Sequence, residues 1–114
     1  MTHRQVELRT LAMHREIARK FAADPESVLA IARANLDRWK PTAGRSAPYH
    51  EEWRRLLLLD LPQLARRIQE DSEEMTALRQ SNPFAGVLTP RERWRILDEA
   101  TARAHHPGVV GDRG

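Results

Sequence analysis

Apolar residues recur at every third or fourth position along most of the chain, which is the spacing of amphipathic helices. Thr2 with Gln5 forms a capping-box pattern that predicts the start of a first helix, and Asp24 before Pro25 predicts the start of a second. The apolar faces comprise Leu8, Leu11, Ala12, Ile17, Ala18 and Phe21 in the first helix and Val28, Leu29, Ala32, Leu36 and Trp39 in the second. Because the connection is short, we expect residues 1–40 to form an antiparallel helical hairpin.

The second half of the chain continues this pattern in shorter segments. Two prolines and a glycine, without periodic apolar residues, mark residues 41–48 as a linker. One helix is expected after the linker, and caps at Asp60, Ser72 and Thr89 predict three more. The apolar positions of these four helices are Tyr49, Trp53, Leu56 and Leu57, then Leu64, Ala65 and Ile68, then Met75 and Leu78, and finally Trp94, Leu97, Thr101 and Ala104.

These elements predict an all-α protein, a small bundle of five to six helices. The N-terminal hairpin would be followed by a C-terminal helical lobe, residues 49–105. Residues 106–114 carry little that would hold them in place, and we expect them to be a mobile tail.

The N-terminus permits a second interpretation. The segment "QVELR", residues 5–9, alternates polar and apolar positions, as would the strand of a ribbon-helix-helix DNA-binding protein. Only Val6 and Leu8 support the alternation, and the apolar run at residues 11–13 interrupts it, so we favour a helix. The candidate phosphate contacts in the DNA-binding alternative are Arg4, Arg9 and Arg15.

Composition sets broad limits on function. The 114 residues are 31% charged and 40% apolar and contain no cysteine, which excludes disulfides and thiolate metal sites and fits a cytoplasmic address. No apolar run resembles a signal peptide or a membrane span, so neither is expected. The net charge of +3 is modest and slightly concentrated in the first half, which permits contact with phosphates without indicating it.

No residue pattern typical of a catalytic or metal centre is present. Neighbouring acidic residues point about 100° apart on a helix, so acid pairs such as Glu73–Glu74 do not converge on one substrate. His105 and His106 lack a third ligand nearby, and His14 is expected to lie on a plain surface or half-buried helix face. We therefore expect no enzyme activity, no cofactor and no bound metal.

The start of the last helix is the best candidate for a nucleic-acid contact. Arg91 and Arg95 share one helix face, and Trp94 between them is able to stack on a base. A tryptophan in the first turn of an amphipathic helix is more often a core residue. We expect Trp94 to be buried, with the arginines solvated or paired with acidic residues of the same helix.

A loop bounded by prolines, residues 81–90, carries apolar side chains although it cannot form a regular helix. Phe84, Val87 and Leu88 either cap the open end of the helical core, with a tight turn at Ala85–Gly86, or form an anchor for a partner. The sequence alone leaves both interpretations open.

Two strings resemble a group of small bacterial antitoxins from two-gene toxin–antitoxin modules. The first, "HR…IA.K…DP..VL..AR.NL.RW", corresponds to His14–Trp39, and the second, "SNPFAGVL(S/T)P.ERW", corresponds to Ser81–Trp94, so the likeness covers most of the chain. The resemblance implies a non-catalytic protein that binds the toxin encoded by the adjacent gene and blocks or distorts its active site.

A nucleotidyltransferase toxin is the first expectation, followed by a PIN-type ribonuclease or a zeta-type kinase. No membrane and no small-molecule substrate are expected. The candidate partner-binding residues are Phe84, Val87, Leu88, Arg91, Trp94 and Arg95. The alternatives are a ribbon-helix-helix-like regulator that binds operator DNA and a generic helical interaction module.

Overall fold

The computed structural model describes residues 2–105, with side chains described up to residue 100. Every regular element in this range is helical, so the prediction of a small all-α bundle is confirmed. The α-helices are α1 (His3–Ala23), α2 (Pro25–Trp39), α3 (Ala47–Leu56), α4 (Leu61–Ile68), α5 (Glu73–Arg79) and α6 (Pro90–His105). The 3₁₀ turns η1 (Lys40–Thr42) and η2 (Gly44–Ser46) join α2 to α3. The tail predicted at residues 106–114 lies outside the described residues.

The helix starts follow the capping residues. Thr2 accepts a hydrogen bond from the Gln5 amide at 3.1 Å, and the Gln5 side chain accepts one from the Thr2 amide at 2.8 Å. The same reciprocal pair opens α6, where Thr89 and Glu92 exchange bonds of 2.8 and 3.1 Å. Each pair satisfies two backbone amides that a helix start leaves without partners.

The N-terminal segment is helical and not extended. "QVELR" lies inside α1, so the strand on which the ribbon-helix-helix alternative depends does not occur among the described residues. None of the described helices combines the length and the apolar character that crossing a membrane requires.

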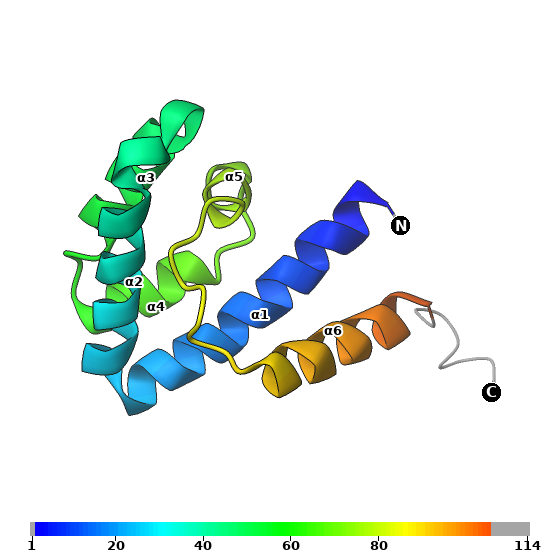
Figure 1. Cartoon of the computed structure of the whole chain (residues 1–114). Coiled ribbons are helices and arrows are strands. Elements are labelled where there is room, and N and C mark those ends of the chain that lie inside the picture. Colours follow the sequence, from blue (N-terminus) through cyan, green and yellow to red (C-terminus); the bar gives the residue numbers. More distant parts are fainter. Residues whose placement is uncertain (1, 106–114) are drawn as a thin grey trace.

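Helix α1 is the centre of the arrangement, because it packs against α2, α4 and α6. Figure 1 shows α6 lying beside α1 and running in the opposite direction. An ion pair of 2.7 Å between Lys20 and Glu92 joins the last turn of α1 to the first turn of α6.

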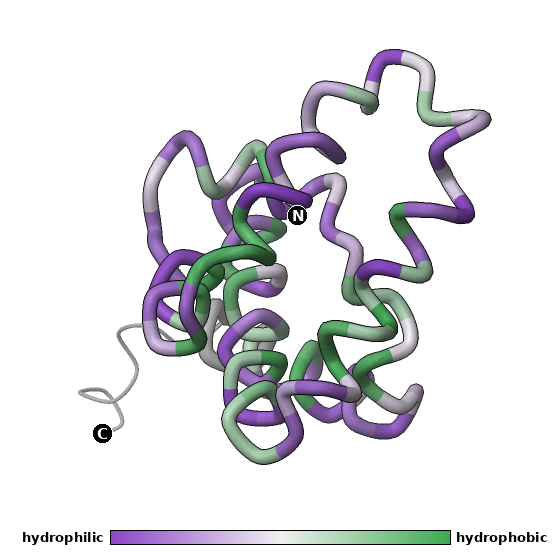
Figure 2. Tube along the Cα trace, turned by 90° about the vertical axis from the view of Figure 1, so that its left-hand side faces the viewer, coloured by the Kyte–Doolittle hydropathy of each residue, from purple (hydrophilic) through white to green (hydrophobic). Residues whose placement is uncertain are grey.

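One hydrophobic core connects all six helices of the described part of the chain. Along the helical turns in Figure 2, hydrophobic positions alternate with hydrophilic ones, as expected for helices with one buried side. The core residues are Ile17, Ala18, Phe21, Val28, Ala32, Leu36, Trp53, Leu56, Leu57, Leu64, Ile68, Met75, Leu78, Phe84, Val87, Leu88 and Ile96. The segments predicted as a hairpin and a lobe therefore share a single core, and residues 41–48 form the 3₁₀ turns and the start of α3 between them.

Candidate functional site

The loop between α5 and α6 is fixed by two asparagine side chains. Asn35 of α2 donates hydrogen bonds to the carbonyls of Pro83 and Ala85, at 2.8 and 2.9 Å. Asn82 accepts one from the Phe84 amide at 3.0 Å and donates one to the Arg79 carbonyl at 3.0 Å. Side-chain partners thus replace the backbone bonds that the loop lacks.

A tight turn completes the loop. The Val87 amide donates to the Phe84 carbonyl at 3.0 Å, and Gly86 has a φ of 96°. A positive φ at the third position of such a turn is easily reached only by glycine. The tight turn predicted at Ala85–Gly86 is present.

The apolar side chains of this loop point into the protein. Phe84, Val87 and Leu88 are 3%, 7% and 7% exposed. The Phe84 ring makes edge contacts with His14, at 5.9 Å between centroids, and with Trp53, at 5.4 Å. The loop therefore closes the core, and in this conformation these three side chains do not offer an open apolar surface.

Trp94 has the opposite position to the one expected, because 69% of its surface is exposed. The prediction that it belongs to the core is wrong. Ile96, at 8% exposure, is the residue of α6 that enters the core. At about 100° per residue, Trp94 lies about 200° around the helix from Ile96 and faces solvent.

The arginines beside Trp94 are exposed as well. No ion pair within the described residues involves Arg91, Arg93 or Arg95. Glu92 instead binds Lys20, and that hydrogen bond, together with the Thr89 amide, lowers the pKa of the Glu92 carboxyl to about 2. The first turns of α6 thus present an aromatic ring among cations that form no ion pair with a described residue.

The residues predicted to contact DNA are not gathered into one cationic surface. Arg4 forms ion pairs of 2.9 Å with Asp71 and 3.3 Å with Glu7, which raise its pKa and neutralise its charge. Arg15 is exposed, whereas Arg9 is partly buried and lies about 140° around α1 from Arg4. This arrangement does not favour the DNA-binding alternative.

His14 was expected on the surface or half-buried, and in the structure it is fully buried. His14 is 1% exposed, and its ring extends from α1 and packs against the Phe84 ring of the loop. Its Nδ1 lies 2.9 Å from the Thr10 carbonyl oxygen, which can only accept, so Nδ1 carries the proton. Burial lowers the pKa of His14 to about 4, and repulsion from Arg79 acts in the same direction. The signal for this burial was its spacing, since His14 follows Leu11 by three residues and precedes Ile17 by three.

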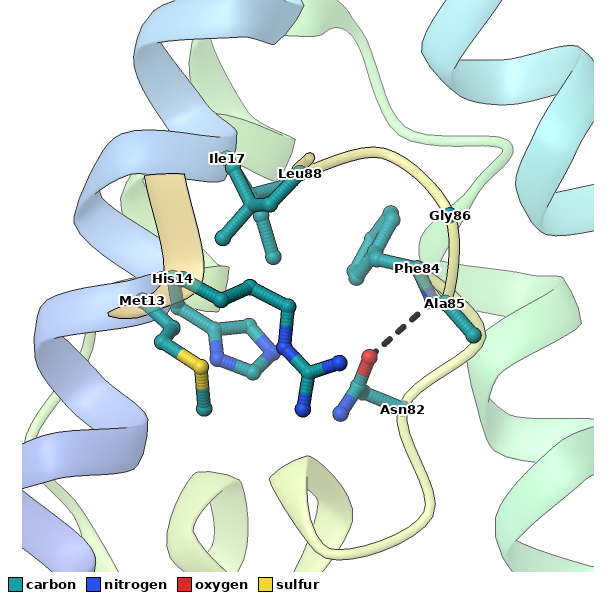
Figure 3. Close-up of a pocket in the computed structure, with 9 residues that line it drawn as sticks. Met13, His14, Ile17, Asn82, Phe84, Ala85, Gly86 and Leu88 are labelled. Carbon is teal, nitrogen blue, oxygen red and sulfur yellow. Dashed lines mark hydrogen bonds between the residues drawn. The ribbon is translucent and has the colours of Figure 1, made fainter. Parts of the chain in front are cut away.

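The neutral His14 ring borders a cavity of about 200 Å³ between α1, the loop and the start of α6. Its Nε2 is buried and has no hydrogen-bond partner among the described residues. Figure 3 shows the ring pointing from α1 toward Asn82 and Phe84. The remaining lining residues are Met13, Ile17, Ala85, Gly86, Leu88 and Arg93.

The part of the chain with described side chains holds no cluster of three or more His, Cys, Asp or Glu residues arranged as metal ligands. His105 and His106 fall outside that part. Comparison of the chain with protein families, with curated proteins and with solved structures found no match.

Proposed function

We propose that this chain is a non-catalytic antitoxin that binds its toxin through the exposed face at the start of α6, with Trp94 as the central anchor. The observation that carries the proposal is the 69% exposure of Trp94. Tryptophan and arginine are the side chains most often found to dominate binding at protein interfaces. The proposal places the protein in the cytoplasm together with a toxin encoded by the adjacent gene, a nucleotidyltransferase in the first instance.

Arg91 and Arg95 extend this surface with charge. Both are exposed, and neither forms an ion pair with a described residue. Unpaired guanidinium groups are available to bind carboxylates or to steer association with an acidic partner. A toxin surface with acidic groups around an apolar pocket would be complementary to this face.

Phe84, Val87 and Leu88 contribute indirectly in this proposal. Their burial fixes the loop that leads directly to the Thr89 cap and hence sets where α6 begins. Truncating Phe84 would disturb the helix that carries Trp94, and loss of function in such a variant would not identify a contact. The test must therefore use exposed residues.

The experiment is to co-express the neighbouring gene with Trp94→Ala and to measure both rescue of growth and affinity for the purified toxin. We expect the thermal midpoint to be unchanged, because the ring is exposed, and the affinity to fall by about 30-fold or more, as for a central anchor worth about 2 kcal/mol. Leu58→Ala is the matched control, since Leu58 is an 80% exposed apolar residue in the turn after α3. Full rescue with unchanged affinity in Trp94→Ala would refute the proposal.

The same face supports one other class of partner, a single-stranded nucleic acid, because an exposed indole among unpaired arginines suits base stacking and phosphate contact. The two classes differ in salt dependence. Binding of an oligonucleotide would weaken steeply with salt through counterion release, and it would persist without the toxin. Tight oligonucleotide binding that Trp94→Ala abolishes would favour this second function.

A further inference from the structure

The cavity beside His14 combines a buried acceptor with apolar walls. Since Nδ1 donates to Thr10, the neutral ring leaves a lone pair on Nε2, which has no partner among the described residues. Nearly all buried polar atoms in proteins have a hydrogen-bond partner, and leaving one without a partner costs free energy. A bound molecule that donates a hydrogen bond to Nε2 would remove this cost.

A cation lies at the same cavity. Arg93 of α6 lines the cavity and is also exposed to solvent. Arg93 forms no ion pair with a described residue. The adjacent Glu92 does not neutralise it, because that carboxylate binds Lys20 at 2.7 Å. An anionic group at the rim would thus have an available partner.

The walls and the size restrict the ligand further. Ile17, Phe84 and Leu88 line the cavity and are buried, and Asn82 is held by its own bonds to the loop. The volume of about 200 Å³ is below the roughly 300–1,000 Å³ of sites for drug-sized molecules, so the ligand must be smaller.

From these features we propose that the cavity binds a small hydroxycarboxylate, whose hydroxyl donates to His14 Nε2 and whose carboxylate pairs with Arg93. The two groups sit on opposite sides of an apolar body that packs on Phe84 and Leu88. This is a binding site and not a catalytic one, and it is separate from the Trp94 face. No pattern in the sequence indicated this site, and no small-molecule substrate was expected.

The probes are the three isomers of hydroxybenzoate, which vary the spacing between hydroxyl and carboxylate on one apolar ring. Benzoate lacks the donor, and phenol lacks the anion. Binding would be followed by calorimetry and by the NMR signals of the His14 ring. We expect at least one isomer to bind at least ten times more tightly than benzoate or phenol and to shift the His14 Nε2 resonance.

Substitution of Arg93, the exposed residue at the edge of the cavity, tests binding without disturbing the core. Arg93 is exposed, so Arg93→Ala should fold normally and weaken the best isomer by about tenfold or more. Arg91→Ala is the matched control, because Arg91 is an exposed arginine of the same helix that does not line the cavity, and it should leave binding unchanged. Equal weakening by both variants would show nonspecific attraction and overturn the proposal. So would the absence of binding by all three isomers at millimolar concentration, or a crystal soaked with the isomers that shows only an ordered water at Nε2.

Discussion

Mild acid should weaken the fold through His14 before it affects the carboxylates. Burial of the ring, with added repulsion from Arg79, lowers its pKa from 6.5 to about 4, although the hydrogen bond to Thr10 opposes this change. In the unfolded chain the ring is exposed and ionises near 6.5. Between pH 6.5 and 4 the unfolded state therefore binds more protons than the folded state, and the free energy of unfolding must fall as the pH falls.

The size of this effect follows from the two pKa values. At about 1.4 kcal/mol for each pH unit, the complete loss amounts to about 3 kcal/mol, of which about 2 kcal/mol appears between pH 7.5 and 5. Stabilities of single domains are about 5–15 kcal/mol, so a loss of this size is readily measurable. Glu92 affects stability at lower pH. Its pKa is lowered to about 2, so the stability that its ionised form contributes is lost only when the pH falls below 4.5, the usual pKa of a glutamate.

The assay is urea unfolding followed by far-UV circular dichroism at several pH values from 7.5 to 5. His14→Gln is the comparison, because it removes the titrating group. We expect the wild-type stability to fall by about 2 kcal/mol and the variant to be nearly insensitive over the same range, whatever its absolute stability. If both proteins lose stability in parallel, or if neither does, the buried neutral histidine is not the cause.

Three further substitutions test the loop. Asn35→Ala removes two hydrogen bonds to loop carbonyls and should cost about 2 kcal/mol in urea unfolding; a cost below about 0.5 kcal/mol would show that the bonds contribute little. Phe84→Ala should cost about 3–5 kcal/mol by calorimetry, against less than about 0.5 kcal/mol for the exposed Leu58→Ala, and equal costs would contradict the core position of Phe84. Gly86→Ala should cost about 1 kcal/mol despite the free space around it, because its φ is 96°, and an unchanged midpoint would mean that the turn relaxes easily.

The helix starts could be predicted because their causes are local. Thr2 with Gln5 and Thr89 with Glu92 satisfy amides only three residues away, so the pattern in the sequence is the whole interaction. The all-helical fold followed from these caps and from the apolar spacing. Neither signal states which helices pack together, and the single core shared by the two predicted segments became apparent only in three dimensions.

The cavity could not be predicted in the same way, because its parts are distant in sequence. His14 precedes Phe84 by about seventy residues, and their ring contact depends on how the loop crosses α1. The spacing of His14 with its apolar neighbours would have indicated burial, but not the missing partner at Nε2. Whether Nε2 has a hydrogen-bond partner depends on which side chains the loop and α6 bring next to the ring.

The position of Trp94 shows where periodicity alone is ambiguous. Trp94 and Ile96 lie about 200° apart on α6, so only one of them can face the core, and the sequence offers an apolar stripe for either choice. The larger side chain was expected inside because burying it gains more free energy. In the structure Ile96 belongs to the core and Trp94 faces solvent, an orientation of α6 in which Glu92 reaches Lys20 of α1. Because Ile96 occupies the core side of α6, Trp94 lies on the opposite side and is exposed. The proposal that a partner covers this ring therefore depends on the Trp94→Ala experiment and not on packing.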